Sequence, residues 1–586
     1  MKSFYYLYNI QVMNTLHDAI AKFNKPDKKG FMAYDVTKEM SLLPEDIKHT
    51  AEYNNEMLAF SLVENSTDNE WGTYYGPVLK GRDEHGAPVY YPPLSLITNE
   101  AVLYWESRIP QMVNPFLRMR YCGLVWEFKR KVSSESYPQS LYSDYMETML
   151  EVIDGDYCAH DVETVMVLER ASSLAKNNQE WLKKVKQSFI RFDKERATDD
   201  KYARLWGALM VFMMEHKNNN LFDSTEEKTI VNTHEARLSR LVQTKDPWAV
   251  KEQALLLAEY YKKQNRQEDI RRVLFQMERA FRESKSKMTS LQWMGNLSII
   301  YQIFTKYKVK EEYKRLLKEM EECGNLATGE MQGHFIPLDY SKENLDEMVS
   351  FLTKGSIDEQ VSKFALYFVP DKKSQSDELT RLSAAYPLKY LMQTQIMDEK
   401  GRPMSVVGSI DNDFDGQLIL HMVNRIKLNG LPMRTAINAL KETGALSVDN
   451  IMRRLKVSPI VDDFRLETIK QALDLYYSDK YKLACYLLVP QIEAIFRTLL
   501  DKSGETVIKS AGQGYTLVTL GDILRDNVIE SIFDENITLY FRILLTDQRG
   551  LNIRNNLCHA TVDDSYFGAF VSDLLLHVLV LLSLIR

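Results

Sequence analysis

Apolar residues recur at helical spacing along most of the chain, and runs with the two-residue alternation of strands are few. The segments 257–274 and 300–317 align without gaps, and each has an apolar first half, a polar turn and an amphipathic second half. Such hairpins stack into solenoids because no single hairpin can bury its apolar face alone. We therefore expect an all-α protein with a helical-hairpin repeat region over residues 156–325.

The first part of the chain, 1–155, predicts a mixed, mainly helical domain. A segment rich in glycine, proline and tyrosine, 71–94, excludes a long helix and predicts a loop. Helical spacing returns over 100–132, around a break at Pro110 and Pro115.

The next part, 326–478, predicts a helical linker domain. Its first stretch, 326–415, is expected to be less regular, because glycines signal turns at Gly324, Gly329, Gly355 and Gly401. Helical spacing predicts three helices after it, at 416–428, 433–442 and 463–478.

The last part, 479–586, predicts a small helical bundle. Its first helix is expected over 480–504, with a kink at Pro490. The elements expected after it are a flexible, glycine-bearing loop at 509–519, short helices at 520–532 and 536–546, and an apolar helix at 574–585. This apolar stretch is the most membrane-like segment, but it is too short to span a bilayer. It also contains His577, so a buried bundle or dimer helix is the better interpretation.

The composition excludes several classes of protein. With 74 basic and 81 acidic residues, the formal net charge is -7, so a general nucleic-acid-coating protein is excluded and any nucleic-acid site must be local. The five cysteines are widely spaced without a CxxC pair, as in a reducing cytosol. The N-terminus carries no signal-peptide pattern. We expect a cytoplasmic protein with no membrane segment.

An acidic run, DNDFDG at 411–416, imitates the start of a calcium loop through Asp411, Asp413 and Asp415. The twelfth position of such a loop should be a bidentate glutamate, and here it is Met422. An acidic N-terminal cap on the following helix accounts for the same residues. We expect no bound metal.

Two other runs resemble phosphate sites only superficially. The glycines of SAGQGYT, 510–516, precede no Walker lysine and lie outside any strand-turn-helix fingerprint. The basic run KKVK, 183–186, is typical of the solvated face of a helix. We therefore expect no cofactor.

The motif that carries chemistry is DQRGLNIRNNLCHA, 547–560. Of the ten histidines in the chain, His559 alone follows an arginine, Arg554, by five to seven residues. Metal-free RNA cleavage requires a base for the ribose 2′-hydroxyl, an acid for the leaving 5′-oxygen and positive charge for the phosphorane. A histidine can transfer the protons, a guanidinium binds phosphate oxygens through two donors, and the amide of Asn555 can orient either group.

The spacing limits how these three side chains meet. Asn555 and His559 are four residues apart and share one helical face, whereas Arg554 lies roughly 140° away from His559 on an ideal helix. We therefore expect the helix to begin or bend within the motif, and Gly550 makes an irregular start feasible.

The arrangement resembles the R-x(4-6)-H motif of the HEPN superfamily of ribonucleases. More narrowly, GLNIRNNLCHA looks like the RN-x-x-x-HG motif of an uncharacterised domain family, with Ala560 in place of the motif's glycine. The segment PQIEAIFRTLL, 490–500, is similar to that family's earlier helix. It places Glu493 and Arg497 one helical turn apart. There they can form a structural ion pair, or they can support the catalytic residues of the site from behind. Weaker similarity to segments that accompany this domain in longer bacterial proteins covers 115–128 and 384–402.

The resemblance implies an all-helical module that usually dimerises, so that two motifs face one another. It implies RNA cleavage without metal that leaves 2′,3′-cyclic phosphate ends, and a role as a toxin or as an anti-phage abortive-infection effector. The long helical region before the module would then sense, restrain or position the nuclease, and a regulatory protein partner is compatible with it.

A second hypothesis stays open: a non-catalytic helical scaffold that dimerises through a HEPN-like bundle and binds a protein partner. Many HEPN relatives are inactive, and an Arg/His pair can simply cap helices. Residues 481–586 carry 9 Lys/Arg and 12 Asp/Glu, a difference of -3, so weak intrinsic RNA affinity is expected unless other regions or a second copy supply positive surface.

Overall fold

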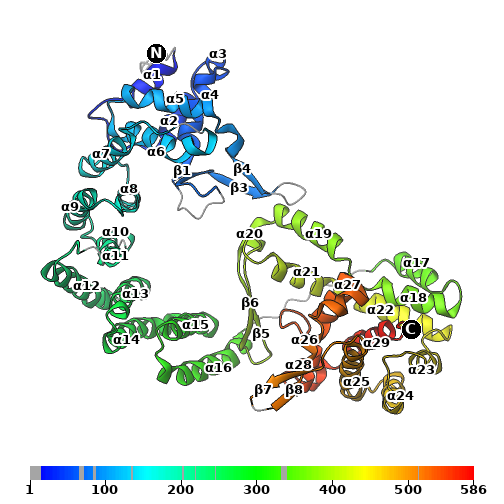
Figure 1. Cartoon of the computed structure of the whole chain (residues 1–586). Helices are drawn as coiled ribbons and strands as arrows, with labels where there is room; N and C mark the ends of the chain where they lie inside the picture. The colour runs from blue at the N-terminus through cyan, green and yellow to red at the C-terminus, as the bar shows by residue number, and fades with distance from the viewer. Residues whose placement is uncertain are drawn as a thin grey trace, which may run out of the picture. The chain divides into compact units, whose positions relative to one another are not determined.

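The computed structural model describes residues 15–64, 71–82, 88–133, 136–200, 203–217, 220–244, 246–330, 340–512 and 514–586. Helices dominate, and the strands form four two-stranded antiparallel ladders (Figure 1). The expected all-α fold class is therefore confirmed. The chain divides into two compact units: unit 1 comprises residues 1–288 and 298–314, and unit 2 comprises 289–297 and 315–586.

Unit 1 begins with short helices packed around the long helix α6. The elements are α1 (Leu16–Ala21), α2 (Ala33–Met40), α3 (Glu45–Lys48), α4 (Ala51–Ser61), α5 (Asn99–Arg108), α6 (Pro115–Val132) and α7 (Leu141–Asp154), with β1 (Val63–Glu64), β2 (Tyr75–Gly76), β3 (Leu79–Arg82) and β4 (Pro88–Tyr91). The segment 71–94, for which a loop was expected, thus supplies three strands. Pro115 is the first residue of α6, where its missing N–H costs nothing, so the expected break at this proline is confirmed.

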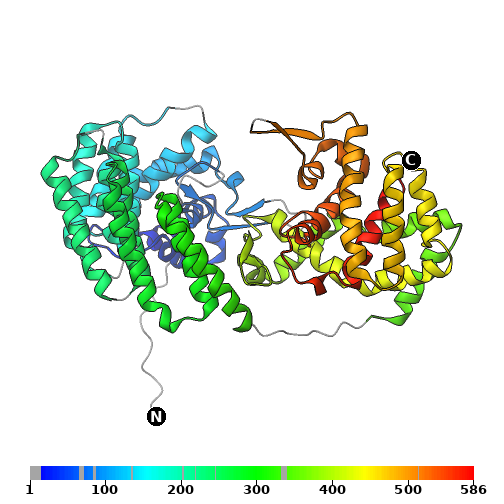
Figure 2. The same ribbon diagram turned by 90° about the horizontal axis from the view of Figure 1, so that it is seen from below.

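Successive helices then lie side by side through the rest of unit 1 (Figures 1 and 2). They are α8 (Asp161–Ala175), α9 (Gln179–Glu195), α10 (Ala203–Trp206), α11 (Ala208–Glu215), α12 (Ser224–Thr244), α13 (Pro247–Lys263) and α14 (Gln267–Ser284). The next helix, α15 (Ser290–Lys306), contributes residues to both units. On α9 one expectation is wrong: Lys186 is buried, and its ammonium donates to the carbonyl of Leu221 (2.9 Å) and pairs with Glu226.

The segments 257–274 and 300–317, which align in sequence, also share one local structure. Each segment holds the end of one helix, a short turn and the start of the next. Equivalent residues, Asn265 and Lys308, both adopt the left-handed conformation, with φ of 56° and 61°. In each turn the next residue's N–H donates back to a carbonyl five residues earlier, at 3.0 Å and 2.9 Å. The first helix of each segment therefore ends with the same backbone conformation and the same hydrogen bond.

Unit 2 is more regular over 326–415 than the glycines suggest. Its first helices are α16 (Tyr313–Glu330), α17 (Lys342–Thr353), α18 (Ile357–Tyr367), α19 (Lys372–Ala385) and α20 (Pro387–Leu391), followed by the ladder of β5 (Thr394–Met397) and β6 (Pro403–Val407). Helix α16 runs through Gly324 and Gly329, so the turns expected there are wrong. A Cβ on Gly324 would lie 2.6 Å from the carbonyl oxygen of Gly401, so this glycine permits close backbone packing rather than a turn. Gly355 and Gly401 do occupy turns, with φ of 100° and 69°.

The three helices expected at 416–428, 433–442 and 463–478 are confirmed within two or three residues, and a fourth lies between the last two. The elements of this region are α21 (Phe414–Leu428), α22 (Gly430–Glu442), α23 (Val448–Lys456) and α24 (Asp463–Tyr477). The remaining elements are α25 (Tyr481–Lys502), β7 (Ile508–Ala511), β8 (Gly514–Leu517), α26 (Leu520–Ile523), α27 (Asn527–Leu545), α28 (Ile553–Cys558) and α29 (Ala569–Leu582).

One continuous hydrophobic core joins these helices, from Met348 on α17 to Leu582 on α29. Helix α25 packs against both α24 and α29 (Figure 1). Residues on both sides of the expected 478/479 boundary therefore share this core. The amino-acid composition does not change at residue 478, because helices with the same kind of buried apolar face lie before and after it.

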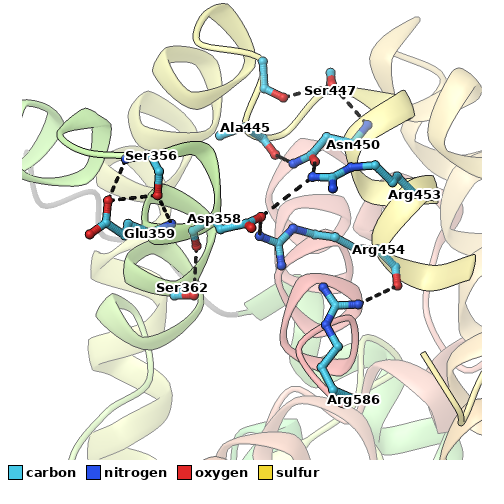
Figure 3. A network of polar contacts seen from close by, with 11 residues as sticks. Ser356, Asp358, Glu359, Ser362, Ala445, Ser447, Asn450, Arg453, Arg454 and Arg586 are labelled. Carbon is cyan, nitrogen blue, oxygen red and sulfur yellow. Dashed lines mark hydrogen bonds and ion pairs between the residues drawn. The ribbon is translucent and has the colours of Figure 1, made fainter. Parts of the chain in front are cut away.

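A polar network also ties the end of the chain to α18 and α23 (Figure 3). Asp358 pairs with Arg454 and, at 3.7 Å, with Arg453. The guanidinium of Arg586 donates to the carbonyl of Arg454 at 3.2 Å. The C-terminal segment is thereby held to an element that lies some 130 residues earlier in the sequence.

The glycine-bearing segment after α25, for which a flexible loop was expected, contains the antiparallel ladder of β7 and β8, all of whose residues are exposed (Figure 2). The expected interruption between two short helices is present at Asp534, whose φ of 66° and ψ of 172° break α27 internally.

The expected apolar helix at 574–585 corresponds to α29, which is buried almost throughout. Among the described residues, α25 is the one helix that is long and apolar enough to cross a membrane by length and composition. In its most apolar window 56% of the residues are buried inside the protein, and core helices share this length and composition.

Candidate functional site

The motif 547–560 forms a tight turn that leads from α27 into the short helix α28. The N–H of Leu551 donates to the carbonyl of Ile543 at 2.8 Å, which folds the turn back onto α27. A Cβ on Gly550 would lie only 2.2 Å from that same carbonyl oxygen. Glycine is therefore required at 550, and the irregular start expected from it is confirmed.

Helix α28 begins after Asn552, whose left-handed conformation (φ 50°, ψ 33°) sets the direction of the helix. Asparagine tolerates this conformation better than most residues. The buried side chains of Ile553 and Leu557 anchor the helix in the core of unit 2. Arg554 and Asn555 are thereby placed half-buried at the edge of that core.

Glu493 of α25 lies between two arginines. Its carboxylate accepts from Nε of Arg554 at 2.7 Å and from Nη2 at 3.3 Å, and from Nη2 of Arg497 at 2.7 Å. The expected ion pair of Glu493 and Arg497 is therefore present, and it also includes Arg554, which lies 61 residues later. Two guanidinium groups share one carboxylate, so the cluster keeps one net positive charge.

Asn555 connects this cluster to the turn. Its Oδ1 accepts from Nη1 of Arg554 at 3.0 Å, and its Nδ2 donates to Oδ1 of Asn552 at 2.7 Å and to the carbonyl of Thr546 at 3.4 Å. Asn555 thus holds Arg554 in place, as an orienting residue does.

His559 lies just beyond the helix as its C-cap, with φ of -105°, and is exposed. Its backbone N–H donates to the carbonyl of Asn555 at 3.0 Å, but its imidazole makes no hydrogen bond or ion pair with a described residue. The structure therefore joins Arg554 and Asn555 to Glu493 and Arg497, and no residue in the described part of the chain pairs with the imidazole of His559.

The cluster's electrostatics follow from its pairing. Burial raises the pKa of Glu493, but the hydrogen bond and charge of Arg554, together with Arg497, outweigh it and hold that pKa below its usual value. The hydrogen bond to Glu493 raises the pKa of Arg554. Burial raises the pKa of Cys558, so the exposed thiol beside Arg554 stays protonated near neutral pH. The site offers guanidinium donors and an imidazole, and its one carboxylate is occupied.

Two polar contacts of the motif were not anticipated from the sequence. Nδ2 of Asn556 donates to the carbonyl of Leu551 at 3.1 Å, and its Oδ1 accepts from the hydroxyl of Thr561 at 2.8 Å. Together with Asn552, these residues fix the turns on both sides of α28. The sequence feature that indicates these contacts is the run of asparagines, because asparagine side chains commonly stabilise turns by hydrogen bonds to nearby backbone groups.

The turn after α28 explains the glycine of the related motif. Ala560 adopts the left-handed conformation, with φ of 48°, which favours glycine over alanine. We expect Ala560→Gly to raise the free energy of unfolding by about 0.5–1 kcal/mol, because relief of the strained backbone exceeds the added chain entropy. Urea unfolding measures the change. The matched control, Ala384→Gly at an exposed position of helix α19, should instead lower stability by a similar amount. Equal destabilisation by both changes would contradict this account of Ala560.

The acidic run at 411–416 is a helix cap, as expected. Oδ1 of Asp413 accepts from the N–H of Gly416 at 2.9 Å, and its Oδ2 accepts from the N–H of Gly408 at 3.1 Å. Asp415 pairs with Arg549 at 2.8 Å. These carboxylates are therefore engaged with the protein itself. Across the described ranges, no group of three or more His, Cys, Asp or Glu side chains is arranged to hold a metal ion.

No protein-family model matches this chain, and no curated protein and no solved structure shows significant similarity to it.

Proposed function

We propose that this protein is a metal-independent endoribonuclease that attacks the phosphodiester through the ribose 2′-hydroxyl and leaves 2′,3′-cyclic phosphate ends. The observation that carries the proposal is the surplus positive charge of the Arg497–Glu493–Arg554 cluster, held next in sequence to the exposed imidazole of His559. Arg554 would stabilise the phosphorane, His559 would transfer protons, and Asn555 would orient Arg554.

A homodimer completes the proposed site. One copy leaves the imidazole of His559 without a partner among the described residues and provides one phosphate-binding cluster. A second copy would bring another His559 and another Arg554 to the same RNA, so that one imidazole can act as base and the other as acid. The biological role proposed with this activity is that of a toxin or an anti-phage effector.

The experiment compares wild type with His559→Ala on single-stranded RNA in the presence of EDTA. We expect cleavage by wild type, cyclic phosphate ends, and a rate about 100- to 10,000-fold lower in the variant. The matched control is His49→Ala, because His49 is likewise an exposed C-cap histidine of a short helix. Cleavage that EDTA abolishes, or an equal rate in His559→Ala, would contradict the proposal.

A non-catalytic scaffold is the second candidate, and one observation favours it. Arg554 already donates to Glu493 and to Asn555, as a purely structural arginine does. Under this alternative the His559→Ala variant behaves like wild type in RNA cleavage and in growth inhibition, and the hairpin repeats of unit 1 bind a protein partner.

A further inference from the structure

Unit 1 contains a cavity of about 210 Å³ that has no part in the proposed nuclease. Its walls come from the start of α2, the β1–β2 ladder, and helices α6, α7 and α8, which gather around α6 in Figure 1. Five separate elements thus converge on one partly open cavity. Tyr34, which is 65% exposed, lies at its edge and marks the side that opens to solvent.

The walls are mainly aromatic and sulfur-bearing. The residues that line the cavity include Phe116, Tyr74, three further tyrosines and four methionines, Met32, Met119, Met149 and Met166. Flexible thioethers and aromatic faces fit flat rings well. An apolar cavity of roughly 150 Å³ accepts benzene, so this somewhat larger one has room for one or two small fused rings.

A buried cation with an unused donor lines the same cavity. Arg170 is 8% exposed, and its guanidinium pairs with Glu127 and lies 4.7 Å from the ring centre of Tyr74. Its Nε has no hydrogen-bond partner within the part of the chain that the structure describes. A buried N–H without a partner is costly, so an acceptor on a bound molecule would relieve that cost.

Glu163 on α8 offers the complementary group. Its Oε2 accepts from the N–H groups of Ala159 at 3.0 Å and His160 at 3.4 Å. Its Oε1 has no hydrogen-bond partner among the described residues. The residues that line the cavity therefore include one carboxylate with an unused acceptor, Glu163, and one guanidinium with an unused donor, Arg170.

The charges around the cavity disfavour an anionic ligand. Glu64 on the wall pairs with the fully buried Arg120, and Arg170 pairs with Glu127. Each cation is thus already neutralised by its own carboxylate. An anionic ligand would meet Glu64 and Glu163 without a free counter-charge, because both arginines are already paired and Glu163 has no cationic partner among the described residues.

We propose that this cavity binds one small, neutral, planar heteroaromatic molecule of the nucleobase type. Such a ring packs against the methionines and tyrosines, donates a ring or amino N–H to Oε1 of Glu163, and presents a ring nitrogen or carbonyl acceptor to Arg170. This inference does not depend on ribonuclease activity, because every residue in it belongs to unit 1 and none belongs to the candidate site.

Calorimetric titration of the full chain with adenine, hypoxanthine, uracil and, separately, toluene tests the proposal. We expect at least one base to bind with one-to-one stoichiometry and to raise the melting temperature, and toluene to do neither. Binding of toluene alone would identify a merely apolar void and overturn the proposal. Failure of all three bases to bind would also overturn it.

Two variants place the binding in this cavity. Met149→Trp fills the space from α7 and should abolish base binding while circular dichroism stays that of a folded protein; Met392→Trp, at a 64% exposed methionine in unit 2, is the matched control. Glu163→Gln keeps the shape of the side chain but turns the free acceptor into a donor, and should weaken binding about 10-fold or more. Unchanged affinity in Glu163→Gln contradicts the proposal even if Met149→Trp fails to fold.

Discussion

Replacing Arg554 with alanine is expected to lower the rate of RNA cleavage about 100- to 1,000-fold, the usual cost of removing one donor to a developing negative charge. The protein should still fold, because Glu493 keeps its 2.7 Å ion pair with Arg497 after the change. Arg554→Lys should fall between wild type and Arg554→Ala, since lysine keeps the charge but cannot donate two parallel hydrogen bonds. Single-turnover cleavage in EDTA, with urea unfolding of each variant, gives the two quantities needed.

The control for Arg554 is an arginine of similar exposure and similar pairing outside the proposed site. Arg196 in unit 1 is 24% exposed at its side chain, against 20% for Arg554, and pairs with Asp156 and Asp161. Arg196→Ala should cost comparable stability without slowing cleavage. If Arg554→Ala loses stability but keeps its rate, Arg554 is a structural tie to Glu493 and the nuclease proposal loses its phosphate-binding group.

The sequence predicted local features well where a residue type has only one structural role in its local context. The repeat of 257–274 and 300–317 recurs down to the left-handed residue of each turn, because helix ends depend on residues close in sequence. Gly550 likewise predicted an irregular start. Gly324 shows the opposite case: glycine serves a turn and a close helix contact equally well, and only the partner backbone at Gly401 decides between them.

The spacing of residues along the sequence could not predict contacts between residues that lie far apart in it. Glu493 and Arg554 were each singled out, but their pairing depends on how α25 packs against α28, 61 residues later. The extent of the core is a similar case. Buried faces of α24 and α25 look alike in sequence whether they belong to one core or two, and the structure joins them in one.

The last helix, α29, carries two titratable groups inside that core. Asp573 accepts from the hydroxyl of Tyr476 at 2.5 Å and pairs with Arg434 at 2.7 Å. His577 is fully buried, and its Nδ1 lies 3.0 Å from the hydroxyl of Tyr540. Its Nε2 lies 3.1 Å from the carbonyl oxygen of Ala365, so Nε2 must carry the proton and Nδ1 accepts from Tyr540. The neutral imidazole thus satisfies both of its nitrogens.

Burial acts on these two groups in opposite directions. It raises the pKa of Asp573 to about 6 and lowers the pKa of His577 to about 4. Between pH 6.5 and 4 the unfolded chain protonates its histidine before the folded protein does, so His577 makes the protein less stable as the pH falls. Between pH 6 and 3.8 the folded protein protonates Asp573 first, so Asp573 makes it more stable. At about 1.4 kcal/mol per unit, each contribution amounts to about 3 kcal/mol, and the two nearly cancel.

Asp573→Asn should therefore expose the destabilising effect of His577. Relative to wild type, its free energy of unfolding should fall by about 3 kcal/mol between pH 7 and pH 4, as measured by urea unfolding across that range. His577→Gln, which can still donate to Ala365 and accept from Tyr540, should show the opposite trend of similar size. The double variant loses both contributions and should follow the wild-type pH dependence again. If the free energy of unfolding of both single variants changes with pH as that of wild type does between pH 7 and pH 4, the two buried groups do not titrate in this range. Their effects on stability would then not be opposed as described.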